Sequence, residues 1–331
     1  MLMHRFEYVN VKSVSEALTQ LRSTNAVAKA GGVDLLDLMK EGIAVPERLI
    51  NLRTINELKF VRDDPASGLH IGPLVSLAQL GIDEVVSKKY AALSQAANGA
   101  ATPQIRNSAT LGGNLCQRPR CWYFRSSDFH CLRKGGDTCF AQEGENTCHA
   151  IFDNQLCAIV HPSSVAVALS AFHARLKLVG NEREWEMPVE EFFVRPETDV
   201  QRENILKPDE LITEVIVPKL LPGTSSYYLK LREKQSFDWP LADVAVVLQL
   251  DDDVCREASI VLGAAAPVPW RVPEAEQLMN GKKISYGLAK EAAELALHEA
   301  APMRDNKHKV QVFKAAVRRT ILLAAGKDPL A

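Results

Sequence analysis

The sequence predicts two domains, an α/β domain over residues 1–222 and an α+β domain over residues 223–331. Strand and helix patterns alternate along the first half, which is typical of α/β folds. Three prolines and several charges then interrupt any long period between residues 192 and 222, so the boundary is expected there. Beyond it, strand patterns come first and helix patterns follow, as in α+β folds.

In the first domain each expected element has its own periodic pattern. Apolar residues at helical spacing follow a short strand within residues 6–21, and glycines separate the next strand from the next helix. The remaining elements follow in the same way. The expected strands are residues 26–30, 49–52, 69–72 and 174–179, and the expected helices are residues 35–40, 77–85, 91–101 and 164–174.

The second domain begins with strands and ends with helices. Three aspartates at residues 251–253 predict a turn between two of the strands. Helical periods then continue to the end of the domain. The expected strands are residues 227–233, 242–250 and 258–262, and the expected helices are residues 273–279, 288–300 and 309–325.

Composition excludes several classes of protein. The chain has 39 basic and 41 acidic residues, a formal net charge of -2, so neither a nucleic-acid nor an anionic-membrane partner is expected. Apolar stretches such as residues 165–171 fall well short of the roughly 20 residues that span a bilayer. Glu7 precedes any apolar segment, so no secretory signal is expected. The expected location is the cytoplasm, or the periplasm by co-export with a signal-bearing partner subunit.

Six of the seven cysteines lie within residues 116–157. This clustering has three candidate explanations, a disulfide-stapled insert, a structural zinc site or an iron-sulfur cluster held by four thiolates. The missing signal and the long chain disfavour disulfides. Only Cys116 and Cys121 have the close spacing usual for zinc, whereas an iron-sulfur cluster tolerates ligands on loops. Six thiols allow fifteen choices of four, so spacing alone does not identify the ligands.

Two glycine pairs lie where backbone amides could meet a phosphate. The sequence has neither the G-x-G-x-x-G fingerprint nor a Walker A motif. Gly31 and Gly32 open a predicted helix, and Gly112 and Gly113 close a predicted turn before Asn114. Two such turns could hold one pyrophosphate. The alternative is that each pair only supplies a positive φ for a tight turn, which is also our interpretation of residues 135–136.

Four motifs, taken together, resemble the FAD-binding medium subunit of the molybdenum hydroxylases, the xanthine dehydrogenase and aldehyde oxidoreductase family. They are AGGVDL at residues 30–35, QIRNSATLGGN at 104–114, HPSS at 161–164 and LGAAAPVPWR at 262–271. The chain is similar in particular to the branch with an additional 4Fe-4S cluster, as in periplasmic aldehyde oxidoreductase. The resemblance implies the PCMH-type flavoprotein fold, with two α/β subdomains in residues 1–222 and the cluster insert at about residues 116–157.

The resemblance also implies a set of FAD contacts. Ser164 stands where the family commonly has an acidic residue that binds the adenosine portion, and a hydroxyl is a weaker acceptor. Ile212 would line the flavin from the interdomain loop. Lys230 would stabilise negative charge on the reduced ring, unless it is merely a solvated strand lysine. The full set is Ala28, Lys29, Ala30, Gly31, Gly32, Val33, Asp34, Leu35, Ala100, Ala101, Thr110, Gly113, Asn114, Ser164, Ile212 and Lys230.

For the cluster, the resemblance implies four ligands, Cys121, Cys131, Cys139 and Cys157. Cys116 and Cys148 are additional, and Cys116 is the better substitute ligand because it lies close to Cys121. We interpret Cys255 as a structural thiol. His130 and His149 are interpreted as ordinary polar loop residues.

The predicted function is electron transfer rather than hydroxylation. By resemblance, a molybdenum-cofactor large subunit oxidises the substrate, a 2Fe-2S small subunit transfers electrons, and FAD passes them to an external acceptor. No motif here argues for acid-base or nucleophilic catalysis, so no catalytic residue is predicted. The alternatives are a zinc-structured binding or scaffold module and a free-standing flavin oxidoreductase.

Overall fold

The computed structural model describes residues 3–180, 182–234 and 237–329. The chain forms two units that alternate along the sequence. The first unit comprises Met1–Gln79, Pro103–Thr138 and His173–Lys219, and the second comprises Leu80–Thr102, Cys139–Phe172 and Leu220–Ala331. The chain enters the second unit for the last time at Leu220, close to the expected boundary, but it also enters it twice before. The division at residues 222 and 223 therefore stays a prediction.

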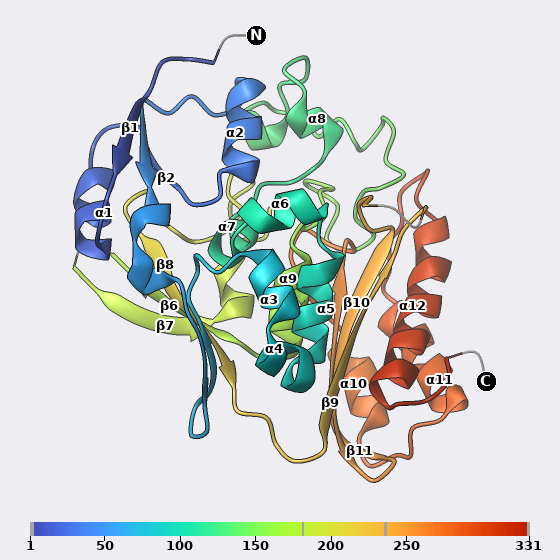
Figure 1. Ribbon diagram of the computed structural model, residues 1–331. Coiled ribbons are helices and arrows are strands. Elements are labelled where there is room, and N and C mark those ends of the chain that lie inside the picture. Colours follow the sequence, from blue (N-terminus) through green and yellow to red (C-terminus); the bar gives the residue numbers. More distant parts are fainter. Residues whose placement is uncertain (1–2, 181, 235–236, 330–331) are drawn as a thin grey trace. The chain divides into compact units, whose positions relative to one another are not determined.

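The first sheet of the first unit is a three-stranded parallel sheet in the order β1-β3-β2, whose outer strands β1 and β2 are labelled in Figure 1. Helix α1 packs against it, with Ala17, Leu18 and Leu21 in the core. Ser13 caps this helix, because its hydroxyl accepts from the Glu16 amide at 3.2 Å. The elements are β1 (Glu7–Asn10), α1 (Val14–Leu21), β2 (Ala26–Lys29), α2 (Val33–Lys40) and β3 (Arg48–Asn51).

The second sheet of the first unit has five antiparallel strands, in the order β4-β5-β8-β6-β7. Its middle strand, β8, lies in the segment where the prolines indicated a domain boundary, and no strand was predicted there. Pro208 precedes β8 and Pro218 is its last residue, so the prolines bound the strand instead of interrupting it. The strands are β4 (Val61–Asp64), β5 (Gly68–Ile71), β6 (Arg175–Val179), β7 (Glu184–Pro188) and β8 (Leu211–Pro218).

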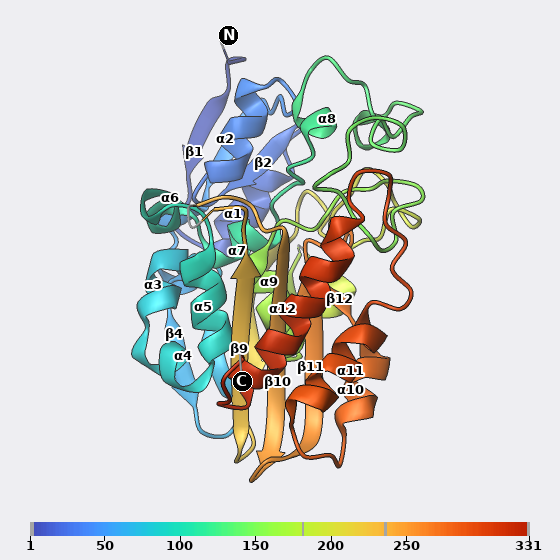
Figure 2. The ribbon, with the colours of Figure 1, turned by 90° about the vertical axis from the view of Figure 1, so that its right-hand side faces the viewer.

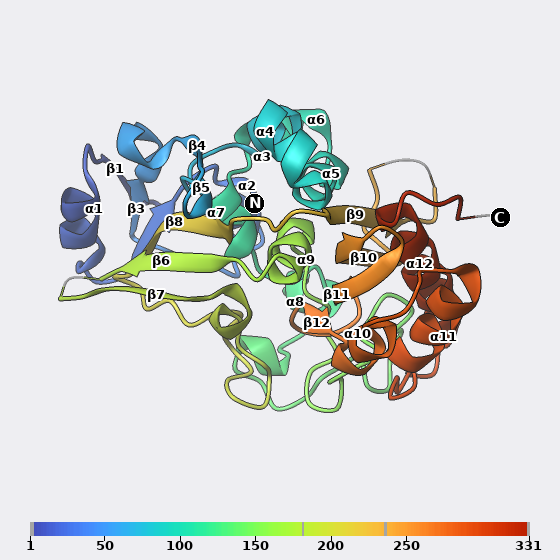
Figure 3. The same ribbon diagram turned by 90° about the horizontal axis from the view of Figure 1, so that it is seen from below.

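The second unit is built on a four-stranded antiparallel sheet in the order β12-β11-β10-β9. Alternate residues of β10 join the core formed with the C-terminal helices, among them Val244 and Val246. Figure 2 shows α12 running across this sheet, and Figure 3 shows helices on both of its sides. The strands are β9 (Thr224–Leu231), β10 (Ala242–Asp251), β11 (Val254–Gly263) and β12 (Trp270–Arg271).

The helices of the second unit follow the predicted pattern. Helix α10 has the predicted bounds, and α5 and α9 pack against the sheet from the side opposite α12 (Figure 3). The apolar sequence of α9 fits this position, since all of its residues are buried. The helices are α4 (Glu84–Lys89), α5 (Ala91–Gly99), α9 (Ser164–Ala171), α10 (Pro273–Met279), α11 (Tyr286–Ala296) and α12 (His308–Ala324).

One expected helix is divided in two. Residues 77–85 were expected to be continuous, but α3 (Leu77–Ile82) ends before Asp83 and α4 begins after it. The Asp83 carboxylate accepts from the amides of Val85 and Val86, both at 3.0 Å, which favours a new helix start. Short α-helices at Pro103–Ser108 (α6), Leu111–Leu115 (α7) and Trp122–Arg125 (α8), and 3-10 helices at Leu52–Thr54, Asn56–Leu58, Leu132–Lys134 and Val189–Phe192, complete the chain. Among the described residues, none of the helices is long and apolar enough to cross a bilayer.

Candidate cofactor sites

The first glycine pair connects β2 to α2 and requires glycine at both positions. Gly32 has a φ of +79° and stands at the N-cap of α2. A Cβ atom on Gly31 would lie 2.1 Å from the carbonyl oxygen of Ser108. The first amides of a helix lack intrahelical partners and favour an anion. The predicted helix opening at this pair is present, with bare backbone at its start.

The second glycine pair lies in a short helix, so the predicted turn at Gly112 and Gly113 is wrong. Thr110 is the N-cap of α7, and its Oγ1 accepts from the Gly113 amide at 3.2 Å. This cap stabilises a helical turn. Gly112 donates to the Pro73 carbonyl at 2.8 Å, and a Cβ atom on Gly112 would lie 2.8 Å from that proline's Cβ. Close packing against Pro73 therefore requires glycine here.

The structure brings the two glycine segments together within the first unit. A Cβ atom on Gly31 would meet both Ser108 and Ala109, directly before the helix that carries the second pair. A Cβ atom on Gly113 would lie 4.0 Å from the Cβ of Ala30. Two stretches of small residues from distant parts of the sequence thus lie side by side at the start of α2, where helix-terminal amides favour an anion such as a diphosphate.

In the second unit, Lys230 reaches the end of α5. Its Nζ donates to the Gly99 carbonyl at 3.0 Å, beside Ala100. Ala100 is buried, and Ala101 has a φ of +41°. Lys230 is therefore a half-buried donor and not the solvated strand lysine that was the alternative. The structure thus brings three of the predicted FAD contacts, Ala100, Ala101 and Lys230, together beside Gly99.

Ser164, at the start of α9, belongs to a buried chain of polar groups that also reaches Gly99, because a Cβ atom on Gly99 would lie 3.7 Å from Tyr228 Cε1. Its hydroxyl hydrogen-bonds to the Tyr228 oxygen, and Tyr228 donates to Asp243 Oδ2 at 2.6 Å. Desolvation raises the pKa of Tyr228 well above its usual value, and it also raises the pKa of Asp243. Ile212 was expected in an interdomain loop, but it is a buried residue of β8 paired with Leu178.

All seven cysteines are thiols, so the structure does not contain the disulfide-stapled insert. Cys139 and Cys157, both in the second unit, are hydrogen-bonded to each other, and this contact together with burial raises the pKa of the Cys139 thiol. Cys121 and Cys131 belong to the first unit and precede short helices. Among the described residues, no three Cys, His, Asp or Glu side chains gather as metal ligands.

The other cysteines and His149 have distinct surroundings. Burial raises the pKa of the Cys116 thiol to about 12, whereas Cys148 is exposed. Cys255 is fully buried in β11, where desolvation raises its pKa to about 11. His149 was interpreted as a polar loop residue, but it is buried. Desolvation and the charge of Lys309 lower its pKa to about 4, so it is neutral at pH 7.

Comparison with known proteins adds a decisive observation. The pattern described as the FAD binding domain in molybdopterin dehydrogenase matches residues 4–220, and that of the CO dehydrogenase flavoprotein C-terminal domain matches residues 226–325. Over 289 residues the chain is 36% identical to the aldehyde oxidoreductase FAD-binding subunit PaoB of Escherichia coli (strain K12), covering 86% of this chain and 89% of that protein. The chain belongs to the FAD-binding medium subunits of the molybdenum hydroxylase family.

Further relatives of this FAD-binding subunit include the carbon monoxide dehydrogenase medium chain of Hydrogenophaga pseudoflava, 28% identical, with 92% of this chain and 90% of that one covered. A solved structure of carbon monoxide dehydrogenase from that organism, which lacks the Mo-pyranopterin moiety, matches with a TM-score of 0.77 at 27% identity, covering 98% of this chain and 99% of that one. These matches confirm the predicted family and the mixed α/β fold. The relatives are subunits of dehydrogenase and oxidoreductase enzymes.

A buried lysine that the sequence did not reveal anchors part of residues 116–157, the cysteine segment, in this FAD-binding subunit. Lys309 is completely buried at the start of α12, and its Nζ donates to the carbonyls of His149 at 2.9 Å and Ala264 at 2.7 Å. Asn306 Nδ2 donates to the carbonyls of His149 at 3.0 Å and Ala150 at 3.1 Å. The acceptors are 45 or more residues distant in sequence, so no local pattern could have predicted these contacts.

The burial of Lys309 predicts that the free energy of unfolding depends on pH. Desolvation lowers its pKa from 10.5 to about 8, so between these values the unfolded chain binds more protons than the folded one. The free energy of unfolding therefore gains up to about 3 kcal/mol between pH 8 and pH 10.5, relative to Lys309→Met. Urea unfolding of both proteins across this range measures the effect. Lys290→Met, on an exposed position of α11, is the control. A difference between wild type and Lys309→Met that stays constant with pH contradicts the prediction.

Proposed function

We propose that this chain holds FAD and one 4Fe-4S cluster and passes electrons from iron-sulfur centres to an external acceptor. It would do so beside a molybdenum-cofactor large subunit and a 2Fe-2S small subunit. The observation that carries the proposal is the meeting of the two glycine segments, 30–32 and 108–113, in a chain of the FAD-binding family. No residue of this chain is assigned a catalytic role.

For FAD, backbone amides are the proposed diphosphate ligands. Residues 28–35 would supply the amides at the start of α2. The amides of Gly113 and Asn114 already donate to Thr110, so Gly113 would only permit close approach of the cofactor, and Thr110 and Asn114 would touch it. Asp34 would contribute only its amide, because its carboxylate accepts from three arginine residues. Of the remaining proposed contacts, the Lys230 ammonium would favour negative charge on the reduced ring. Ala100, Ala101, Ser164 and Ile212 complete the set. Bound FAD supplies an acceptor for electrons one or two at a time.

The proposed cluster ligands are Cys121, Cys131, Cys139 and Cys157. The contact between the thiols of Cys139 and Cys157 supports the proposal, because paired sulfur donors suit iron-sulfur clusters or zinc. Cys131 and Cys157 are buried, as fits ligands shielded from water. Their loops have little regular structure, and such loops can wrap around a metal centre.

Family membership favours this proposal over a zinc-structured scaffold and over a free-standing flavin oxidoreductase. The relatives are named as subunits or medium chains, which supports partner subunits for this chain as well. The ends of the two family matches, at residues 220 and 226, support the proposed domain division at 222 and 223.

Partner dependence tests this function. The chain is purified anaerobically, alone and with co-expressed partners, and screened against aldehydes and heteroaromatic compounds while flavin absorbance is followed. We expect a substrate to bleach the flavin only in the complex, because hydroxylation belongs to the partner. NADH oxidation by the isolated chain, as fast as by the complex, would instead establish a free-standing flavin oxidoreductase. Absence of flavin from both preparations would overturn the proposal.

A further inference from the structure

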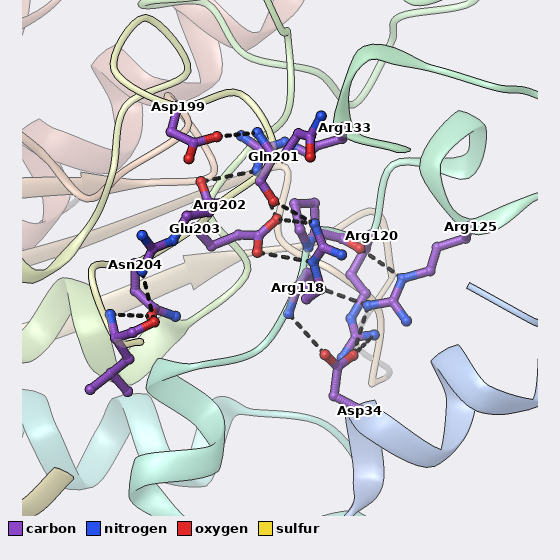
Figure 4. Close-up of polar contacts among 12 residues, drawn as sticks. Asp34, Arg118, Arg120, Arg125, Arg133, Asp199, Gln201, Arg202, Glu203 and Asn204 are labelled. Atoms are coloured by element: carbon purple, nitrogen blue, oxygen red, sulfur yellow. Dashed lines mark hydrogen bonds and ion pairs between the residues drawn. The ribbon is translucent and has the colours of Figure 1, made fainter. Parts of the chain in front are cut away.

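Two carboxylates hold the first half of the cysteine segment in the first unit (Figure 4). Asp34 belongs to the first turn of α2, and Glu203 lies in the loop before β8. Between them they accept from the side chains of four arginines in the cysteine segment, Arg118, Arg120, Arg125 and Arg133. Both carboxylates are largely shielded, with side-chain exposures of 15% and 10%.

Asp34 binds the chain on both sides of Cys121. Its Oδ2 accepts from the Arg118 amide at 2.8 Å, and its Oδ1 accepts from Arg125 Nη2 at 2.7 Å. Arg120 Nη1 forms a third contact, with Oδ1. Arg120 and Arg125 lie one residue before and four residues after Cys121. One carboxylate therefore fixes both flanks of a proposed cluster ligand.

Arg125 also transmits this anchoring to the backbone of Cys121. Its Nε donates to the Pro119 carbonyl at 2.8 Å, and its Nη2 donates to the Arg118 carbonyl at 3.0 Å. Its amide donates to the carbonyl of Cys121 at 2.9 Å, which closes the turn of α8. The loop that carries Cys121 is thus closed on itself and bound to α2 through the same guanidinium.

Glu203 anchors the chain beside Cys131 in the way that Asp34 anchors it beside Cys121. Arg133, two residues later, is 1% exposed at its side chain and donates to Glu203 Oε1 at 2.7 Å. The Cys131 carbonyl accepts from the amides of Lys134 at 2.8 Å and Gly136 at 3.0 Å. Arg118 joins the two carboxylates, because its guanidinium binds Glu203 in a bidentate pair at 2.9 and 3.0 Å while its amide binds Asp34.

We propose that Asp34 and Glu203 are positioning residues for the cluster, which set Cys121 and Cys131 in place against the diphosphate-binding start of α2. The inference rests on the proposed function, since it concerns the cluster ligands and the FAD site. Asp34 lies two residues after Gly32, so the turn that would bind FAD is also the turn that anchors the cysteine loop. The anchoring therefore ties the loop of Cys121 to the helix whose start would bind the FAD diphosphate.

Asp37 provides a matched control on the same helix. Its Oδ2 lies 3.1 Å from Arg125 Nη1, but its side chain is 54% exposed, and its Arg120 contact is 4.0 Å long. An exposed ion pair of this kind contributes little because water and salt screen it. Asp34→Asn and Asp37→Asn remove the same charge one turn apart, so only their burial and contacts differ.

Hydrogen exchange and redox titration of the anaerobically purified complex test the proposal. In Asp34→Asn we expect amides of residues 116–125 to exchange about tenfold faster than in wild type, because a shielded anchor is lost. The midpoint potential of the cluster should rise because negative charge is lost near it. Asp37→Asn should match wild type in both measurements.

Glu203→Gln tests the same proposal if Asp34→Asn fails to fold. Glu203→Gln should loosen residues 131–136 while leaving FAD in place. If iron is present and both Asp34→Asn and Glu203→Gln behave like Asp37→Asn, the positioning role is overturned and the proposed function stands. If wild type contains FAD but lacks iron in this chain, the proposed cluster itself fails and this inference falls with it.

Discussion

Replacing Gly31 with alanine is expected to weaken FAD binding by about a hundredfold. The added Cβ would lie 2.1 Å from the Ser108 carbonyl oxygen and 2.9 Å from its carbon. Both atoms are backbone, so no side chain can rotate away, and the start of α2 has to move. Overpacking of this kind costs about 1–3 kcal/mol, and the upper end corresponds to about two orders of magnitude in affinity. Titration of the apoprotein with FAD, followed by flavin fluorescence, measures the change.

Two further glycines calibrate this result. A Cβ atom on Gly113 would lie 3.0 Å from Thr110 Oγ1, a side-chain atom that can shift, so Gly113→Ala should weaken FAD binding less than Gly31→Ala. A Cβ atom on Gly287, within α11, would meet only Ser285 Oγ at 3.9 Å. Gly287→Ala should therefore leave FAD binding unchanged. Wild-type affinity in Gly31→Ala would show that the diphosphate does not lie at this turn.

Replacing Cys157 with serine is expected to remove the cluster while leaving FAD bound. The Cys157 thiol is buried against that of Cys139, and a serine hydroxyl is a poor replacement for a thiolate on iron. Iron in this chain should fall from about four atoms to nearly none. The measurement is iron and acid-labile sulfide per chain after anaerobic purification.

Cys255→Ser is the matched control for Cys157→Ser. Cys255 is equally buried and lies in the same unit, but it belongs to β11, and its backbone pairs with Gly281 and Lys282. We expect Cys255→Ser to retain its iron. Equal iron loss in both variants would indicate a general folding defect, and full retention in Cys157→Ser would remove this residue from the ligand set.

Much of the fold could be predicted because its patterns are local. The strand, glycine pair and helix at residues 26–40 occur as expected, and so does the hairpin of β10 and β11 around the aspartate turn. Strand β8 was missed because the prolines on either side of it were interpreted as breaks in the periodic pattern. The division between α3 and α4 depends on the Asp83 carboxylate, which caps α4. It was missed because the apolar period continues without interruption across Asp83.

The candidate site could be predicted only where residue type carried the information. Glycine pairs indicated bare backbone, but their adjacency depends on contacts between residues 31 and 108. The anchoring of the cysteine loop is hidden for the same reason, because the Arg118 amide and Asp34 are 84 residues apart. Lys309 has the sequence context of an ordinary helix start, and only its carbonyl partners show that it is buried.

The most direct test counts the cofactors of this chain itself. The complex is purified without oxygen, the chain is separated from its partners, and FAD, iron, acid-labile sulfide and zinc are each measured per chain. We predict one FAD, four irons and four sulfides, and no zinc. A chain with neither FAD nor iron, or one with zinc in place of iron, would contradict the account.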